Sequence, residues 1–268
     1  MTITIKRKYK YPIYFLISLI IIIPIIYTII SIREIEAPKD AQIKSENKIN
    51  NNEPIPLQEI VSTETYKITK DFTIVPINPD ADKKIVLLTI DDGPSSQSDD
   101  IVRILSEQNV KAIFFINGMN HKAHSDIIKK EFEAGHAIGN HTWSHQNLKK
   151  ITEEKAKKEI ESNSILIEKE TSQKPIFFRA PYGILSPYAK QYIDEQGMMA
   201  FNWSSSSLDW EKKSKDKKIF IENITKNLKP GSIILMHEHT WSRDALPDLI
   251  TAIKEKGYTF INPKNIVK

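Results

Sequence analysis

Two histidines and two aspartates have the residue types and spacing of a metal site. His141 and His145 are four residues apart, so they share one face of a helical turn and can reach a single ion. Asp91 and Asp92 are adjacent before a Gly-Pro turn, and two such carboxylates repel each other unless a cation or an arginine lies between them. Each pattern alone is also typical of an ordinary turn. Together they indicate a His-His-Asp metal site that leaves positions open for water and substrate.

Three further polar segments could supply acid–base and orienting groups. Arg179 begins the sequence Arg-Ala-Pro-Tyr and can hold a carboxylate through paired hydrogen bonds. Asp209 precedes Trp210, and His237 follows the apolar run 232–236, where it could be an acid–base group facing the metal site. In isolation, a structural salt bridge, a surface loop and an ordinary loop histidine explain these residues equally well.

The composition excludes several classes of site. There is no cysteine, so disulfides, thiolate zinc sites and cysteine nucleophiles are absent, and any metal must be held by histidine and carboxylate. The net charge is +4, but Lys and Arg are dispersed rather than gathered in a basic stripe, so we expect no nucleic-acid partner. The length of 268 residues allows one large domain with accessory segments.

From residue 83 onward, short apolar runs alternate with helical segments. The expected strands are 85–90, 110–116, 137–139, 175–178, 199–203, 232–236 and 258–261, and the expected helices are 98–108, 124–134, 152–170, 187–196, 215–228 and 244–256. Six or seven alternations predict a parallel α/β fold, either an open sheet or a barrel. All the polar segments above follow an expected strand, and in such folds the active groups gather at the C-terminal strand ends.

The N-terminal segment predicts a membrane anchor. Residues 11–30 carry no charge and are mostly apolar, and about 20 such residues in a helix cross a bilayer. Lys and Arg precede this stretch, which favours a cytoplasmic N-terminus and an extracytoplasmic remainder. A cleavable signal peptide is the alternative, but no small-x-small site follows Ile30. We therefore expect a single-pass cell-membrane protein.

These features predict three parts of the chain. Residues 1–32 are the cytoplasmic tip and transmembrane anchor, residues 33–81 an extracytoplasmic linker, and residues 82–268 the catalytic domain. The segment 56–80 contains short β-prone pieces that could form a hairpin or continue the linker.

Taken in chain order, the polar segments resemble the motifs of the NodB-homology polysaccharide deacetylases across residues 82–265. The resemblance rests on Asp-Asp-Gly-Pro, His-Thr-x-x-His, Arg-x-Pro-Tyr, Asp-Trp and Leu-x-His. It implies a distorted (β/α) barrel of about seven units and metal-dependent removal of N-acetyl groups from a polysaccharide. One motif departs from the family pattern, because Ser206 stands where the usual Asp-Ser-x-Asp-Trp begins with aspartate.

The resemblance also implies a role for each matching residue. Asp92, His141 and His145 would hold one divalent metal ion, with Zn²⁺ the first choice and Co²⁺, Ni²⁺ or Fe²⁺ the alternatives. Asp91 would be the general base, and His237 the general acid. Arg179 would orient Asp91, and Asp209 would orient His237. The backbone N–H of Tyr182 would be the oxyanion donor. The pocket walls would be formed by Pro181, Trp210 and Leu235.

The resemblance implies cell-wall peptidoglycan as the substrate, deacetylated at N-acetylglucosamine. Chitin oligomers, poly-N-acetylglucosamine and acetylated xylan are alternatives, since the motifs concern the acetyl group and the metal. A reading from another class is a wall-binding protein with an impaired site, and Ser206 motivates it. We expect a monomer, and we expect His121, His124, His136 and His239 to be peripheral to the site.

Overall fold

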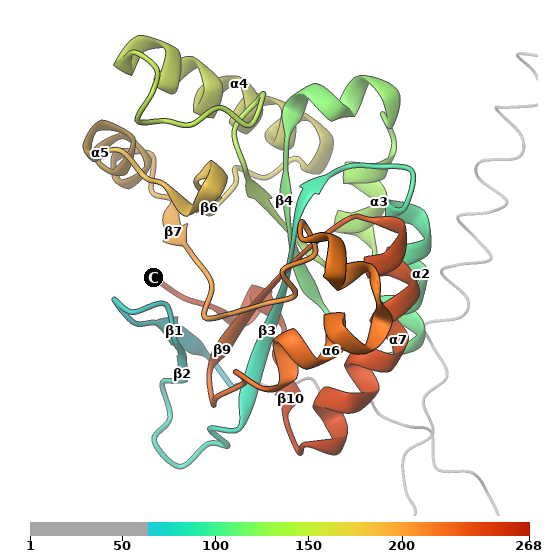
Figure 1. Cartoon of the computed structure of the whole chain (residues 1–268). Coiled ribbons are helices and arrows are strands. Elements are labelled where there is room, and N and C mark those ends of the chain that lie inside the picture. Colours follow the sequence, from blue (N-terminus) through green and yellow to red (C-terminus); the bar gives the residue numbers. More distant parts are fainter. Residues whose placement is uncertain (1–63) are drawn as a thin grey trace, which may run out of the picture. The chain divides into compact units, whose positions relative to one another are not determined.

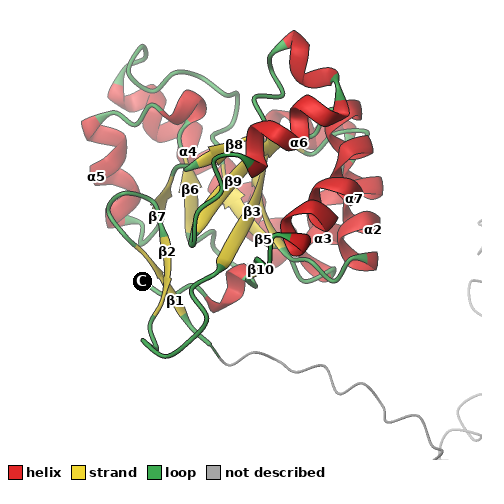
Figure 2. Cartoon of the chain, turned by 60° about the horizontal axis from the view of Figure 1, so that its bottom comes forward, coloured by secondary structure: helices red, strands yellow, loops and turns green. Residues whose placement is uncertain are grey.

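The computed structural model describes residues 64–268, so the expected membrane anchor and most of the linker lie outside the described residues. Within residues 64–268, no helix combines the length and the apolar character needed to cross a membrane. The described chain is built on one parallel sheet with helices on its outside (Figures 1 and 2).

The sheet has β3 near its middle. Its strands are β3 (Ile85–Gly93), β4 (Ala112–Ile116), β5 (Ala137–Asn140), β6 (Phe177–Arg179), β7 (Met199–Phe201), β8 (Ser205–Ser206), β9 (Ser232–His237) and β10 (Thr259–Phe260). They lie in the order β7-β6-β5-β4-β3-β9-β8, with β10 paired to the start of β3. The predicted parallel α/β fold is confirmed. The sheet is curled, and no hydrogen-bonded pairing joins its edge strands β7 and β8 among the described residues.

The helices follow the predicted alternation. They are α2 (Ser98–Glu107), α3 (Ile127–Glu133), α4 (Glu153–Thr171), α5 (Pro187–Glu195), α6 (Lys217–Thr225) and α7 (Thr240–Glu255), with the 3₁₀ turns η1 (Gly118–Ala123), η2 (Pro181–Gly183), η3 (Lys212–Lys215) and η4 (Pro263–Asn265). Two capping hydroxyls fix helix starts, since Thr152 accepts from Lys155 N and Ser186 from Ala189 N. Helix α7 begins four residues earlier than the predicted 244.

Alternating side chains of β3 divide the core into two. Val86, Leu88 and Ile90 belong to the cluster that packs under the outer helices, whereas Ile85 and Leu87 belong to a second cluster on the inner face of the curl. Because successive strand residues point to opposite faces, Asp91 continues the inner row toward the C-terminal end. The inner face is therefore apolar at its start and polar where the predicted site residues gather.

A two-stranded hairpin covers the apolar end of the inner core. Strands β1 (Tyr66–Ile68) and β2 (Ile74–Pro76) pair antiparallel, and Ile74 is buried within the inner cluster. The backbone N–H of Ile74 donates to the carbonyl of Gly231 at 2.9 Å, just before β9 starts. The segment 66–76 is thus packed on the sheet, at the end of the strands opposite the polar groups.

Candidate active site

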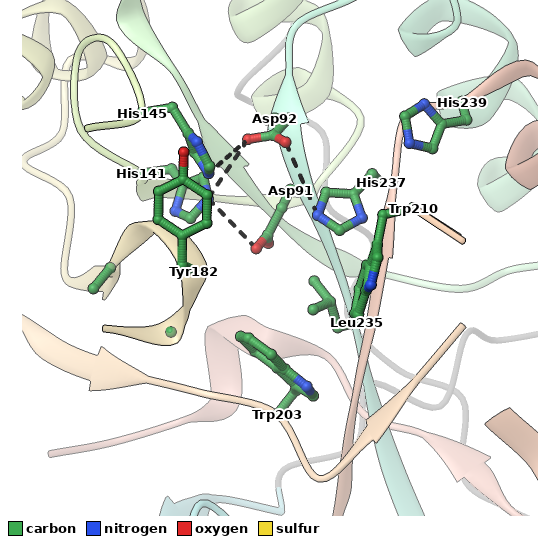
Figure 3. A pocket seen from close by; sticks show the side chains of 12 residues that line it. Asp91, Asp92, His141, His145, Tyr182, Trp203, Trp210, Leu235, His237 and His239 are labelled. Carbon is green, nitrogen blue, oxygen red and sulfur yellow. Dashed lines mark ion pairs between the residues drawn. The ribbon is translucent and has the colours of Figure 1, made fainter. Parts of the chain in front are cut away.

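Strand register brings the predicted base and the predicted acid side by side. Asp91 of β3 is the register partner of His237 of β9, and both lie at the C-terminal ends of their strands. Both side chains line one cavity of about 560 Å³ (Figure 3). Two residues separated by 146 positions in the chain are therefore neighbours because their strands are parallel and adjacent.

Asp91 is a buried carboxylate with one oxygen committed to Arg179. The Nη1 of Arg179 donates to Asp91 Oδ1 at 2.7 Å and to the Thr89 hydroxyl at 2.8 Å, and its Nη2 donates to the carbonyl of Asn202 at 3.1 Å. Arg179 is fully buried, with its guanidinium 4.3 Å from the ring centroid of Phe115. This fixed ion pair leaves Asp91 Oδ2 facing the cavity, 3.6 Å from His141 Nε2.

Asp92, His141 and His145 lie close together near Asp91 Oδ2, the oxygen that Arg179 does not bind. Their nearest ligand atoms are Asp92 Oδ1 and the two histidine Nε2 atoms, at 3.6 Å for His141 and 3.5 Å for His145 (Figure 3). Oxygen and nitrogen ligands at about 2.1 Å in tetrahedral arrangement lie about 3.4 Å apart, close to these separations. The three residues are thus spaced as ligands of one ion.

Hydrogen bonding independently supports a cation between them. Asp92 Oδ1 is buried and accepts no hydrogen bond from the described residues, although a buried carboxylate oxygen normally has a partner. His141 Nδ1 lies 2.7 Å from the carbonyl of Arg179, and a carbonyl can only accept, so Nδ1 carries the proton. The lone pair of His141 is therefore on Nε2, directed at Asp92, which is the tautomer that a metal ligand needs. The residues fit a divalent ion such as Zn²⁺.

His237 is held by Asp209 from behind. His237 Nδ1 donates to Asp209 Oδ1 at 2.7 Å, and the backbone N–H of His237 donates to Oδ2, also at 2.7 Å. Burial lowers the pKa of His237, but its hydrogen bond to Asp209 and the charges of Asp209, Asp91 and Asp92 outweigh burial and raise the pKa to about 9. His237 is thus protonated at neutral pH and can donate a proton from Nε2, which faces the cavity.

Asp209, His237 and His239 are a second group of residues that could hold a metal ion, after Asp92, His141 and His145. One possible ligand atom from each of the three lies within 4.8 Å of the other two. Both Asp209 oxygens are already occupied, because Ser242 Oγ also donates to Oδ2 at 3.0 Å. Asp209 and His237 are therefore a hydrogen-bonded carboxylate–imidazole pair, with His239 beside them. The group of Asp92, His141 and His145 fits a metal better, because Asp92 Oδ1 has no hydrogen-bond partner among the described residues.

Strained backbone surrounds the site. Asp92, His145 and Tyr182 all have positive φ, of 66°, 55° and 60°, which residues with side chains seldom adopt. In η2 the turn's own hydrogen bonds are donated by Gly183 and Ile184, so the N–H of Tyr182 is outside that ladder. Its ring meets the His145 ring edge-on at 4.7 Å between centroids. Tyr182, the residue whose N–H is the predicted oxyanion donor, therefore lies beside a predicted metal ligand.

The cavity walls agree in part with the predicted pocket. Trp210 and Leu235 line it, and Trp210 meets the ring of His237 edge-on at 5.7 Å (Figure 3). Pro181, the first residue of η2, is buried and is not among the residues that line the cavity. Three residues that the sequence did not single out, Ala180, Gly183 and Trp203, complete the walls together with His239.

His239 was expected to be peripheral, and that expectation is wrong. Its ring lies 5.9 Å from that of His237 and forms part of the cavity wall. A single sequence signal could have indicated this, namely its position two residues after His237, on the same side of the chain where the strand ends.

Ser206 preserves the turn that precedes Asp209. Its Oγ accepts a hydrogen bond from the backbone N–H of Leu208 at 3.1 Å. Serine and aspartate both cap their own backbone two residues on, so a hydroxyl can replace the usual carboxylate there. Leu208 has φ of 53°, and Asp209 still reaches His237.

Glu238 is a further residue that the sequence did not single out. This buried carboxylate accepts from Ser95 Oγ at 2.6 Å and from Ser98 Oγ at 2.5 Å, and it is next to His237 in the chain. A Cβ at Gly93 would lie 2.5 Å from Glu238 Oε1, so a larger residue there would require this buried carboxylate to move. Glu238 thus joins the end of β9 to the turn that follows Asp91 and Asp92.

Comparison with known proteins gives a consistent result. A family model described as polysaccharide deacetylase matches residues 78–201. A peptidoglycan-N-acetylglucosamine deacetylase of Bacillus cereus is 36% identical over 185 residues, covering 67% of this chain and 66% of that protein. The peptidoglycan-N-acetylmuramic acid deacetylase PdaA of Bacillus subtilis is 33% identical over 184 residues, covering 66% of this chain and 69% of PdaA.

A solved structure shows the same fold. The crystal structure of the Bc1960 peptidoglycan N-acetylglucosamine deacetylase superimposes with a TM-score of 0.64 at 35% identity, covering 67% of this chain and 86% of that one. This chain spans about two thirds of the length of the two curated relatives above. On the matched residues, the fold and the site described above, the chain belongs to the polysaccharide deacetylase family.

Proposed function

We propose that this protein hydrolyses the N-acetyl group of N-acetylglucosamine residues in cell-wall peptidoglycan and releases acetate. The observation that carries the proposal is the register pairing of Asp91 with His237, beside the Asp92–His141–His145 group, in one cavity. The B. cereus relative is named for N-acetylglucosamine, whereas PdaA is named for N-acetylmuramic acid. The choice of N-acetylglucosamine as the sugar is therefore the more specific part of the proposal.

The side chains divide the proton transfers between two sides of the cavity. Asp91 Oδ2 accepts a proton from the attacking water, while Arg179 holds Oδ1 and prevents the carboxylate from turning. His237 donates its Nε2 proton to the leaving amine nitrogen, which departs readily only once protonated. The N–H of Tyr182 stabilises the negative charge that develops on the carbonyl oxygen, and one such donor typically contributes a few kcal/mol.

Asp92, His141 and His145 would hold one divalent ion, for which we propose Zn²⁺, with Co²⁺, Ni²⁺ or Fe²⁺ as alternatives. When bound, such an ion lowers the pKa of water toward 7 and polarises a carbonyl group. Leu235 and Trp210 provide an apolar wall suited to the acetyl methyl group.

We also propose the finer points of organisation. The curled sheet supports a distorted barrel of about seven units, because its edge strands β7 and β8 follow one another in the chain. The uncharged stretch 11–30 supports a single-pass anchor that holds the catalytic domain outside the cytoplasm, with residues 33–81 as a linker that includes short β segments. A monomer is proposed on the sequence alone.

The test is acetate release by the purified protein supplied with Zn²⁺ or Co²⁺. Peptidoglycan, N-acetylglucosamine oligomers and acetylated xylan are compared, with Asp91→Asn as the control. We expect release from peptidoglycan that is lost in the control. Release from xylan alone would contradict the wall substrate, and no release from any polymer with metal bound would favour a wall-binding protein with an impaired site.

A further inference from the structure

A row of three side chains leads out of the cavity on the side of His237. His239 forms part of the cavity wall, and its ring stacks on Trp241 at 4.3 Å between centroids and 22° between planes. The Nζ of Lys215 lies 4.5 Å from the centroid of the Trp241 ring. Lys215 is therefore two ring contacts away from the cavity wall.

This row is fixed to the catalytic machinery. Trp241 donates its indole N–H to the carbonyl of Asp209 at 3.2 Å, and Asp209 holds His237. The charge of Lys215 is felt at His239, whose pKa is lowered first by burial and further by the charges of His237 and Lys215. The fold therefore fixes the position of His239 and Trp241 relative to His237. Lys215 contacts this fixed ring rather than extending freely into solvent.

The charges next to the row are only partly neutralised. Five lysines lie between residues 212 and 218, immediately after Trp210. Lys213, Lys217 and Lys218 pair with Glu211, Asp248 and Glu222. Lys212 and Lys215 are exposed and have no acidic partner within residues 64–268. Lys215, which contacts the row, and Lys212, at the other end of the same 3₁₀ turn, therefore carry positive charges that no acidic side chain neutralises in this part of the chain.

We infer that Lys212 and Lys215, with His239 and Trp241 as the adjoining platform, bind a carboxylate carried by a sugar next to the one being deacetylated. Chitin and poly-N-acetylglucosamine carry no carboxylate, whereas the muramyl units of peptidoglycan carry carboxylates on their lactyl-peptide substituents. The inference rests on the proposed function and names the substrate class more closely. These residues would make the enzyme prefer an anionic glycan over a neutral one of equal length.

The test uses matched substrates and the full-length protein. Muramyl-containing tetrasaccharides with free carboxylates are compared with the same compounds after amidation, and with a neutral N-acetylglucosamine tetramer. The test variant is Lys212→Ala/Lys215→Ala, and the matched control is Lys217→Ala/Lys218→Ala, which removes two lysines that have acidic partners. Acetate release gives kcat and KM, and quenching of tryptophan fluorescence gives binding without turnover.

We expect the test variant to raise KM for the carboxylated substrate about five- to tenfold, since each exposed charge pair contributes modestly. On the amidated and neutral substrates its kcat/KM should change less than about twofold, and 0.5 M salt should erase the wild-type preference. The control variant should keep that preference. Equal kcat/KM for carboxylated and amidated substrates, or an unchanged KM in the test variant, would overturn the inference. Carboxylate-dependent binding without acetate release would support the basic row and refute the deacetylase function.

Discussion

Asp91 and Asp92 are chain neighbours that face different partners. The alternation of β3 places Asp91 on the inner face, where Arg179 takes one of its oxygens. Asp92 has a positive φ, and its carboxylate lies against two histidine nitrogens. Two identical side chains can therefore have separate functions, one as a proton acceptor and the other as a ligand, because the backbone turns sharply between them.

At this scale we predict a shift of the pH profile in Asp209→Asn. His237 donates only when protonated, so activity should be lost as pH rises through its pKa of about 9. The amide removes the charge that raises this pKa, so the alkaline limb of kcat against pH should move down by at least about one pH unit.

The control for this variant is Ser242→Ala, which removes one hydrogen bond to Asp209 Oδ2 and no charge. The alkaline limb of the control should stay within a few tenths of a unit of the wild type. An unshifted limb in Asp209→Asn would mean that His237 is not the proton donor.

That the two aspartates and His141, His145 and His237 gather in one cavity could be predicted from their types and their positions after strands. The orientation of their neighbours could not. Pro181 is buried at the start of η2 rather than lining the cavity, and His239 lines the cavity directly before α7 begins. Turn geometry and the exact start of a helix decide such orientations, and neither is encoded in residue type or spacing.

A set of hydrogen bonds between the end of β9 and the start of α2 helps to position the site. Glu238, after β9, accepts hydrogen bonds from Ser95 and Ser98 at the start of α2, across the Gly-Pro turn that follows β3. This connection ties the strand that carries His237 to the strand that carries Asp91. It is nonlocal, with more than 100 residues between its partners, and so no sequence pattern indicates it.

We predict that Glu238→Ala lowers the free energy of unfolding by about 1–3 kcal/mol, because two buried hydroxyls lose their shared acceptor. It should also lower kcat with little change in KM, since the turn beside Asp92 loses its support. Urea unfolding and steady-state acetate release measure the two effects.

Glu238→Gln is the matched control. Burial, the largest cause, raises the pKa of Glu238, so its ionised form is disfavoured in the fold and its stabilising contribution is lost as pH rises above 4.5. The neutral amide should therefore restore stability most fully above neutral pH. A Gln variant as damaged as Ala at pH 8 would contradict this account.

The predicted helices and strands are close to the observed ones because apolar runs and caps are local signals. Predicted strand 85–90 corresponds to β3 and helix 187–196 to α5, each within a few residues. Strand β8 was missed, since two residues carry no periodicity. The place of β9 beside β3 was not predictable either, because sheet order depends on packing between distant segments.

In the whole folded unit, the two ends of the sheet differ in the residues that they carry. One end is an apolar core and the other holds the candidate active site. The hairpin β1–β2 covers the apolar end of the inner core, and the opposite end holds the charged groups. Stability and catalysis can therefore be changed separately by substitutions at the two ends.

Ile74→Ala tests this division. Ile74 is 1% exposed in the inner cluster, and removing a buried isoleucine typically costs about 2–5 kcal/mol. We expect this loss in urea unfolding, with kcat unchanged at temperatures where the variant is folded. The control Ile77→Ala removes a side chain that is 49% exposed and should cost less than about 1 kcal/mol. Equal costs would show that the hairpin is not part of the core.

The most direct test of the central claim is acetate release from peptidoglycan by Asp91→Asn, measured on protein with its metal content determined. Asp92, His141 and His145 are unchanged in this variant, so we predict one bound divalent ion per chain and a loss of kcat of at least about 10²-fold. Near-wild-type acetate release by the metal-bound variant would contradict the assignment of Asp91 as the base, and with it the proposed division of function between the two aspartates.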